Sequence, residues 1–429
     1  MQVHLAYGDA GLDVELPEKR TLVVAPRYPA AVADATAEVR RALREPVAGP
    51  PLAELVQRGQ HVAVAICDGT RPQPRDIVVP ALLELLADVV DLDDVVVLVA
   101  TGTHRASTPL ELEEMLGGEV LGREVLSSVR VVNHDARNRS SLVDLGVLGD
   151  GVPVLLAREW VEADVRITTG FVEPHFFAGF SGGPKLVAPG LAGLETTLVL
   201  HDARRIGDER ATWGVVAGNP VHDDVRAIAA ATGVDFACDV VLDAAHRIVA
   251  AFGGELSAMH AAACALSRSV AMRPVPHRFD VVVTSNSGFP LDQNLYQAVK
   301  GMSAAASVVV PGGLVVVAAE CRDGFPDHGS YKDLLVSAGS PEELLGAIEG
   351  RGRAEPDQWQ VQVQARVQRI ARVAVHADGL GDADLRAAHL EPVADVGERV
   401  RDELERLGPG ATCCVLPEGP QTIPYLVAG

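Results

Sequence analysis

The feature that most constrains the fold is a strand–loop–helix pattern that occurs twice in the first third of the chain. An apolar run at residues 61–66 leads into a polar loop at 67–74, and a helical pattern follows at 76–89. The second unit has its apolar run at 95–100 and its loop at 101–105. Repeats of this kind predict a mainly parallel β-sheet with helices on its faces.

Two further apolar runs, at 129–132 and 164–169, extend the predicted sheet, and the second of them leads into a long loop at 170–190. In parallel sheets, ligands bind beyond the carboxyl ends of the strands. We therefore expect the loops that follow these strands to lie along one edge. The side chains that would share a site there are Arg71, His104, His175 and Lys185.

The loop at 170–190 is rich in glycine and aromatic residues and poor in helix formers. Its glycines allow the backbone to approach another group closely. The loop contains His175 and Lys185, and His201 follows sixteen residues after the lysine. An imidazole can take and give a proton near neutral pH, and a lysine amine can serve as a nucleophile or covalent anchor. We therefore place the chemistry in this loop.

Lysine is rare in this chain, since only four of the 37 basic residues are lysines. Two of them, Lys185 and Lys300, lie in the two most motif-like stretches. The stretch around Lys300 is a predicted helix at 292–306, on which Tyr296 and Lys300 are four residues apart and therefore share a face, with Gln297 beside them. Both lysines are candidates for a role that arginine cannot fill.

Length and charge limit the classes of protein to which this chain can belong. A chain of 429 residues is too long for one compact core. Its net charge of −21 argues against a nucleic-acid or anionic-membrane partner. The six cysteines are scattered without a CxxC pair, and no apolar run reaches the roughly 20 residues of a membrane span. The sequence therefore predicts a cytoplasmic enzyme with reduced thiols.

We expect the α/β fold class, with two α/β domains and mainly parallel sheets. The proline-rich run at 273–278 is typical of a linker. The predicted N-terminal domain spans residues 1–272 and contains the cofactor site and the candidate catalytic histidines. The predicted C-terminal domain spans residues 279–395 and would clamp the substrate and cofactor. The segment 396–429 is expected to return and pack on the N-terminal domain.

The residues alone leave more than one function open. His104, His175 and His201 could bind zinc in a hydrolase. A two-domain protein that binds a small carboxylate without turnover is a second alternative. A nucleoside triphosphatase is excluded, because the segment before Lys185 lacks the GxxxxGK[ST] spacing of a phosphate-binding loop.

Taken together and in order, the motifs resemble the nickel-pincer-dependent lactate racemase family, whose members act on 2-hydroxy acids. The resemblance covers nearly the whole chain. The motifs that carry it are Tyr7-Gly, Asp68-Gly-Thr-Arg-Pro72, Ala100-Thr-Gly-Thr-His104-Arg, His175-Phe-Phe-Ala-Gly-Phe-Ser-Gly-Gly-Pro-Lys185, His201 and Tyr296-Gln-Ala-Val-Lys300.

The resemblance implies a cofactor and a role for each candidate residue. Lys185 would be joined through a thioamide to the nickel-pincer nucleotide, a pyridinium-3-thioamide-5-thiocarboxylate mononucleotide, and His201 would be the protein ligand of the nickel. His104 and His175 would be the paired acid/base residues. The residues implied to hold the substrate carboxylate are Arg71, Gln297 and Lys300, and those implied to lie near the cofactor or its phosphate are Asp68, Thr70 and Tyr296.

The resemblance also implies racemisation of a 2-hydroxy acid by proton-coupled hydride transfer, in a cleft between the two domains. Enzymes that synthesise the pincer would be partners of the chain. Pro184 stands where a larger residue is common before the lysine in lactate racemases, so the sequence does not fix which 2-hydroxy acid is the substrate. Lactate is the default among lactate, malate, aryl-lactates and sugar acids. The sequence does not decide between a monomer and an oligomer.

Overall fold

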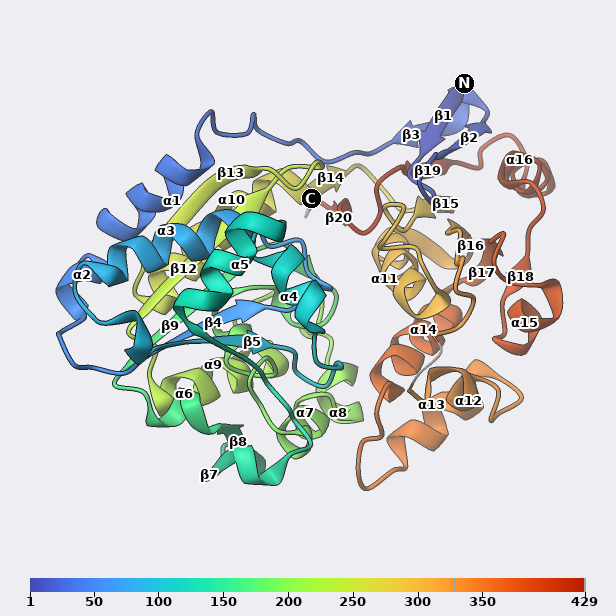
Figure 1. Ribbon diagram of the computed structural model, residues 1–429. Helices are drawn as coiled ribbons and strands as arrows, with labels where there is room; N and C mark the ends of the chain where they lie inside the picture. Colours follow the sequence, from blue (N-terminus) through green and yellow to red (C-terminus); the bar gives the residue numbers. More distant parts are fainter. Residues whose placement is uncertain (327–328, 428–429) are drawn as a thin grey trace. The chain divides into compact units, whose positions relative to one another are not determined.

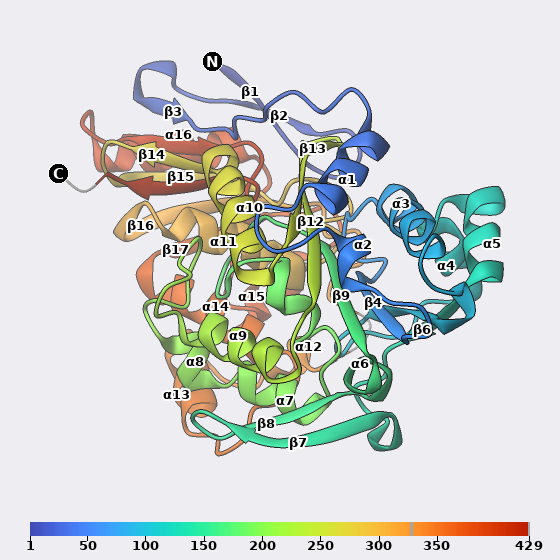
Figure 2. The ribbon, with the colours of Figure 1, turned by 90° about the vertical axis from the view of Figure 1, so that its left-hand side faces the viewer.

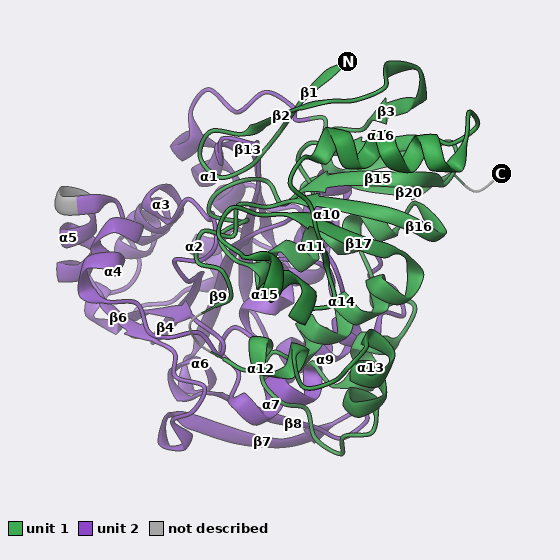
Figure 3. Cartoon of the chain, turned by 90° about the vertical axis from the view of Figure 1, so that its right-hand side faces the viewer, with its two compact units in different colours: residues 1–27, 201–214, 269–429 green, residues 28–200, 215–268 purple. Residues whose placement is uncertain are grey.

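The computed structural model describes residues 1–326 and 329–427, apart from the side chains of residues 119–121. The chain forms two compact units, which Figure 3 distinguishes by colour. Unit 1 comprises residues 1–27, 201–214 and 269–429, and unit 2 comprises residues 28–200 and 215–268. No helix among the described residues is both long and apolar enough to span a membrane. All six cysteines are free and buried.

Unit 2 is built on a six-stranded sheet with the strand order β13-β12-β9-β4-β5-β6. Its strands are β4 (Val62–Cys67), β5 (Val95–Ala100), β6 (Arg130–Asn133), β9 (Val165–Phe171), β12 (Phe236–Leu242) and β13 (Ile248–Gly254). Only β13 is antiparallel to its neighbour. Every residue of β4 is buried, as is typical of a central parallel strand covered on both faces. The two predicted strand–loop–helix units are confirmed, with β4 beside β5.

Helices cover both faces of this sheet, with α1 and α3 on one side and α9 on the other (Figures 1 and 2). The helices of unit 2 are α1 (Ala35–Arg44), α2 (Leu52–Leu55), α3 (Arg75–Ala87), α4 (Pro109–Met115), α5 (Gly118–Ser128), α6 (Arg158–Glu162), α7 (Leu194–Leu200) and α9 (Pro220–Thr232), with α10 (Leu256–Ala271) reaching into unit 1. Two hairpins complete the unit, β7 (Leu142–Leu148) with β8 (Val152–Ala157) and β10 (Pro174–His175) with β11 (Gly179–Phe180).

Unit 1 contains a second six-stranded sheet, in which all pairings are parallel and the order is β18-β17-β16-β15-β19-β3. Its strands are β3 (Thr21–Val23), β15 (Phe279–Ser285), β16 (Val309–Ala318), β17 (Arg372–His376), β18 (Glu391–Pro392) and β19 (Cys413–Leu416). Two smaller pairs are β1 (Gln2–Leu5) with β2 (Leu12–Glu15) and β14 (Met272–Val275) with β20 (Ile423–Leu426). The expected fold class of two α/β units with mainly parallel sheets is confirmed.

The helices of unit 1 include those that carry candidate site residues. They are α8 (Ala203–Gly207), α11 (Leu295–Ala306), α12 (Tyr331–Leu335), α13 (Pro341–Glu349), α14 (Gln358–Ile370), α15 (Asp382–Ala387) and α16 (Val396–Leu407). Helix α11 begins at Asn294, whose side chain accepts a hydrogen bond from the amide of Gln297. Such an N-cap satisfies a backbone donor that the helix itself leaves open, and it fixes where the helix starts.

The two compact units are made of segments that alternate along the chain. The segment 396–429, which was expected to pack on a domain of residues 1–272, pairs through β19 with β3 of that range and with β15, in the sheet of unit 1. Residues 201–214 also belong to unit 1. All four residues of β19 are buried. The sequence of a short apolar strand does not indicate which sheet it joins. Residues 327–328 and 428–429 of the expected segments lie outside the described residues.

Candidate active site

Six of the candidate residues lie in unit 2, in loops that follow three neighbouring parallel strands. The loop after β4 carries Asp68, Thr70 and Arg71, the loop after β5 carries His104, and the loop after β9 carries His175 and Lys185. Because β9, β4 and β5 are adjacent and parallel, their carboxyl ends meet at one edge of the sheet. The expected grouping of these loops at one edge therefore follows from the observed topology.

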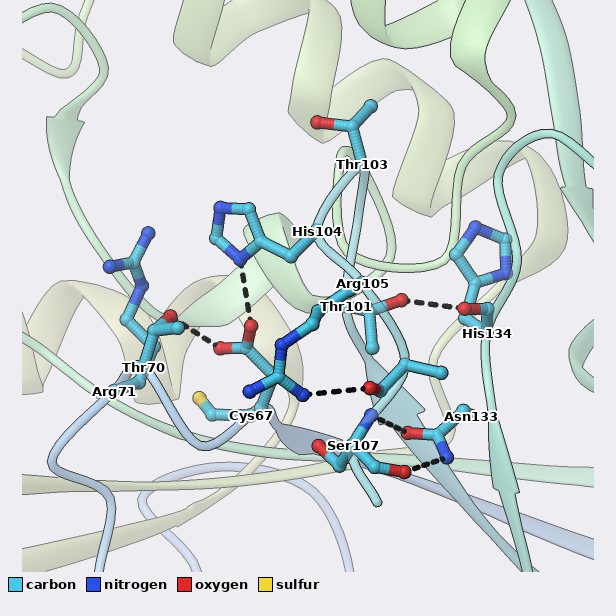
Figure 4. Close-up of polar contacts among 12 residues, drawn as sticks. Cys67, Thr70, Arg71, Thr101, Thr103, His104, Arg105, Ser107, Asn133 and His134 are labelled. Atoms are coloured by element: carbon cyan, nitrogen blue, oxygen red, sulfur yellow. Dashed lines mark hydrogen bonds and ion pairs between the residues drawn. The ribbon is translucent and has the colours of Figure 1, made fainter. Parts of the chain in front are cut away.

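Asp68 and His104 form a hydrogen-bonded pair across two of these loops. The Nδ1 atom of His104 lies 2.7 Å from Oδ2 of Asp68, and the hydroxyl of Thr70 donates to the other carboxylate oxygen at 2.8 Å. Dashed lines from His104 and Thr70 in Figure 4 mark these two contacts. The Asp68 side chain is only 7 % exposed, whereas that of His104 is 46 % exposed. The carboxylate is thus fixed in the protein interior, and the imidazole it holds is open to a substrate.

The electrostatics of this pair keep the Asp68 carboxyl ionised. Burial by itself raises the pKa of Asp68, but the hydrogen bond and positive charge of His104, together with the charge of Arg71, lower it below its ordinary value. Asp68 is therefore ionised at neutral pH and accepts the Nδ1 proton of His104. Nε2 is the ring nitrogen of His104 that is not bonded to the carboxylate.

Two buried residues that sequence reasoning missed fix the loop after β4. The Arg75 guanidinium donates to the carbonyl oxygens of Asp68 at 2.9 Å and of Arg71 at 3.0 Å. The Gln73 side chain accepts from the amide of Cys67 at 2.8 Å and donates to Thr169 at 2.9 Å. Arg75 thus joins the loop to the start of α3, and Gln73 joins it to β4 and β9, so the backbone of Asp68 and Arg71 is held in place.

His175 and Lys185 lie in one compact loop and share an aromatic neighbour. The β10–β11 hairpin brings the amide of Ala178 to within 3.2 Å of Nδ1 of His175. The His175 ring meets the edge of Phe177 at a centroid distance of 4.5 Å, and Nζ of Lys185 lies 6.0 Å from the centroid of the same ring. Phe177 therefore contacts the imidazole and lies beside the amine.

The other four candidate residues lie in unit 1. His201 precedes α8, and its ring packs against Trp359 of α14 at a centroid distance of 4.7 Å. Tyr296, Gln297 and Lys300 lie on α11, which confirms that they share a helix. The Trp359 indole donates to the hydroxyl of Tyr296 at 3.1 Å. Unit 1 thus gathers His201 and Tyr296 around Trp359.

Sequence reasoning missed Trp359, although the chain offered a signal for it. Trp359 is one of only three tryptophans and stands in an unusual run of alternating glutamines at 358–364. Among the described residues, no group of three or more histidine, cysteine, aspartate or glutamate side chains is placed to hold a metal ion.

Comparison with known proteins identifies the family. A model of the lactate racemase N-terminal domain matches residues 7–214, and a model of the lactate racemase C-terminal domain matches residues 275–423. The chain is 33 % identical over 430 aligned positions to a lactate racemase of Thermoanaerobacterium thermosaccharolyticum, covering 98 % of each chain. The chain belongs to the lactate racemase family. A lactate racemase of Lactiplantibacillus plantarum is 34 % identical over 384 positions, which are 89 % of each chain.

Solved structures agree with membership in the lactate racemase family. The structure of the lactate racemase apoprotein from T. thermosaccharolyticum matches with a TM-score of 0.92 and 31 % identity, covering 99 % of this chain and 100 % of that one. A protein from Thermotoga maritima shares the fold, with a TM-score of 0.67 and 18 % identity over 92 % of this chain and 97 % of that one. The chain is thus an enzyme of the isomerase class, and the zinc hydrolase and the non-catalytic carboxylate-binding protein are set aside.

Proposed function

We propose that this chain interconverts the enantiomers of a 2-hydroxy acid, with lactate as the expected substrate, and that it uses a nickel-pincer nucleotide joined to Lys185. The observation that carries the proposal is the arrangement at the edge of the unit 2 sheet. An imidazole on a buried carboxylate follows β5, and an imidazole and an amine follow β9. The names of the relatives, both lactate racemases, support the same substrate.

His104 has the surroundings of a general base. Its Nε2 atom would take the hydroxyl proton of the substrate while the Asp68 carboxylate stabilises the resulting imidazolium through Nδ1. When bound, the pincer nucleotide supplies the acceptor for the hydrogen of the substrate's α-carbon, with its electron pair. Loss of the proton and of this hydride would leave a planar 2-oxo acid. Return of the hydride to the opposite face of the α-carbon, with return of a proton to the oxygen, would give the other enantiomer.

His175 would serve the second enantiomer. Two enantiomers present their hydroxyl groups in different directions, so each needs its own acid/base group. Nδ1 of His175 lies within hydrogen-bonding reach of the Ala178 amide, so its own loop helps to set the orientation of the ring. The two histidines would therefore perform the same proton transfer from two different loops.

The residues present fit the proposed cofactor. Lys185 follows a turn in which Gly182 and Gly183 have φ angles of +70° and +51°, a backbone that other residues rarely adopt. The aromatic side chain of Phe177 lies near its amine, and Trp359 packs on His201, so both proposed attachment points are bordered by rings that could contact a planar pyridinium. A single imidazole ligand also suits a metal whose other ligands come from the nucleotide.

Cationic and amide side chains would bind the substrate carboxylate. Arg71 can bind a carboxylate in bidentate fashion, and Lys300 and Gln297 of α11 would complete its binding. Asp68, Thr70 and Tyr296 remain proposed neighbours of the cofactor, and for Asp68 the pairing with His104 adds a second role.

The test is to produce the chain together with pincer-synthesising enzymes and to measure the intact mass and the Lys185 peptide. We expect an adduct on Lys185 that is absent from Lys185→Ala and Lys185→Arg. The loaded protein should convert L-lactate and D-lactate into one another, as followed by a chiral assay. A panel of other 2-hydroxy acids would establish which substrate is preferred.

A known lactate racemase, produced in the same way, is the control for cofactor supply. An unmodified chain beside a loaded control would contradict the cofactor assignment. A loaded chain that racemises none of the 2-hydroxy acids would contradict the activity instead.

A further inference from the structure

Four polar side chains lie beneath the loop that carries His175 and Lys185, and nothing above assigns them a role. Asn219 caps α9, His222 lies on its first turn, Asp239 lies in the middle of β12 and His260 lies on α10. Their exposed fractions are 0 %, 1 %, 0 % and 5 %. A polar side chain buried to this extent is costly unless it finds a hydrogen-bond partner.

Three of the side chains contact the backbone of the loop, and the fourth, His222, stacks on one of them. Asn219 donates to the carbonyl of Phe177 at 2.9 Å, and the His222 ring stacks on the His260 ring at a centroid distance of 5.6 Å. Nε2 of His260 lies 2.9 Å from the carbonyl oxygen of Ser181, and Oδ2 of Asp239 accepts the amide of Gly183 at 2.6 Å. We call these four residues the polar cradle, and three of them hold the segment 177–183 at successive positions.

The glycines of the loop provide the space that Asp239 needs. A Cβ at Gly182 would lie 2.5 Å from Oδ2 of Asp239, and a Cβ at Gly170 would lie 3.0 Å from Oδ1. Gly170 is also the residue that pairs with Asp239 between β9 and β12. The close approach that the sequence predicted for these glycines is therefore made, in part, by a buried carboxylate.

A similar contact explains Gly183. A Cβ at this position would lie 2.6 Å from the ring of His260. The Ser181 hydroxyl further ties the segment to the strand end, since it donates to the carbonyl of Phe171 and accepts the amide of Glu173, both at 2.9 Å. The backbone before Lys185 is thus fixed on several sides within unit 2.

We propose that Asp239 is a positioning residue for the reaction and that, with Asn219 and His260, it fixes the backbone on which His175 and Lys185 are presented. This inference rests on the proposed function, in which Lys185 anchors the cofactor and His175 transfers a proton. Residues 177–183 lie between His175 and Lys185 in the chain, so a shift of their backbone would displace both side chains. Small displacements of reacting groups cause large losses of rate.

The closing experiment compares Asp239→Ala, Asp239→Asn and the control Asp243→Asn. Asparagine keeps an oxygen that can accept the Gly183 amide, whereas alanine does not. Asp243 follows the same strand and also accepts backbone amides, at 3.0 Å from Ala245 and 2.9 Å from Arg247, but these lie in its own turn. Asp243→Asn therefore reports the effect of altering a similar aspartate outside the cradle.

The first measurement is amide hydrogen exchange of the chain without cofactor, and the second is the rate at which Lys185 acquires the adduct. We expect Asp239→Ala to speed exchange at 177–186 at least 10-fold and to slow loading at least 10-fold. Asp239→Asn and Asp243→Asn should stay within about 3-fold of the parent chain in both measurements. Recovery by asparagine would show that the hydrogen-bonding side chain matters and not its negative charge.

A folded Asp239→Ala chain with unchanged exchange at 177–186 would overturn the proposal, as would faster exchange spread evenly over unit 2. If Asp239→Ala does not fold, His260→Ala and His260→Gln provide the same comparison at Ser181, since glutamine keeps a donor. If even the parent chain acquires no adduct beside a loaded control racemase, the proposed function fails while hydrogen exchange still decides the role of the cradle.

Discussion

The two regions that carry the candidate residues are supported by different kinds of side chain. In unit 2, the loop with His175 and Lys185 rests on Asp239 and His260, with His222 stacked on His260, and all three can change charge. In unit 1, α14 supports the corresponding residues through glutamines. Gln360 donates to the carbonyl of Tyr296, and Gln362 donates to the carbonyl of Ala203, two residues after His201, at 2.8 Å.

This difference predicts which of the two regions has side-chain supports that change protonation with pH. The four glutamines at positions 358, 360, 362 and 364 are at most 1 % exposed, and none of them titrates. Burial lowers the pKa of His222 to about 4 and raises the pKa of Asp239 to about 7. The hydrogen bonds made by the glutamines of α14 should therefore stay the same between pH 4 and 7. In this range the buried residues that support the Lys185 loop change their protonation.

The largest expected effect comes from His104 and Asp68, the proposed catalytic pair of unit 2. His104→Ala should lower kcat by about 10²–10⁴-fold, because a positioned general base is lost. Asp68→Asn should approach this loss, since an amide does not stabilise an imidazolium. The kcat of each variant is measured from steady-state racemisation of both enantiomers by the loaded enzyme. Arg105→Gln, which alters the neighbouring side chain, should change kcat less than 3-fold, and an equal loss there would mean that the loop is generally disturbed.

The next effect concerns the pH dependence of stability. Because burial raises the pKa of Asp239 to about 7, the folded chain keeps a proton that the unfolded chain releases near pH 4. The resulting stabilisation is full below pH 4 and is lost as the pH rises toward about 7, at up to ~1.4 kcal/mol per pH unit. Asp239→Asn removes this contribution to stability. The free energy of unfolding of the variant, relative to that of the parent chain, should therefore rise between pH 4 and 7.

Urea unfolding of both chains at several pH values measures this difference, and Asp243→Asn is again the matched control. Despite the raising effect of desolvation, hydrogen bonds from Arg247 lower the pKa of Asp243. Its contribution is therefore already constant above pH 5. A parallel pH dependence for both variants would remove Asp239 as the cause and would weaken the contrast between the two regions.

In unit 1, Gln362→Met should destabilise the chain by about 1–3 kcal/mol, because the carbonyl of Ala203 loses its donor in a buried setting. The loss should be the same at pH 5 and pH 8, since no titrating group is involved. Urea unfolding at the two pH values measures it. A loss that depends on pH would break the proposed distinction between neutral and ionisable supports.

The smallest effect is expected for ionisable groups at the surface. Arg40 of α1 and Glu84 of α3 form an ion pair in unit 2, with side chains 41 % and 60 % exposed. Arg40→Gln should cost only about 0.5 kcal/mol, because solvent screens exposed charges. Thermal unfolding measures it. A much larger loss would show that charge in general, and not its burial, distinguishes unit 2.

The sequence predicted the parts of this molecule that local patterns encode. Apolar runs located β4, β5 and β9. The capping box of α4 is likewise encoded by two residues that are three positions apart, Thr108 and Glu111. Because the topology of parallel strands brings their carboxyl ends together, the predicted loops also fell at one edge. These predictions needed only residues that are neighbours in the chain or in adjacent strands.

The contacts that the sequence did not predict join residues far apart in the chain. Asp239 is 56 residues from Gly183, and His260 is 79 residues from Ser181. An aspartate inside an apolar strand gives no local signal of which amide it will meet. The pairing of Asp68 with His104, 36 residues apart, was hidden for the same reason.

The sheet of unit 1 has a consequence for biosynthesis. Strand β3 at residues 21–23 obtains its neighbour only from β19 at residues 413–416, so it emerges from the ribosome nearly the whole chain before its partner does. Unit 2, made of residues 28–200 and 215–268, is available much earlier, and domains synthesised first generally fold first. An early stop before β19 would thus leave a finished unit 2 beside a sheet whose open strand edges are a target for chaperones and for aggregation.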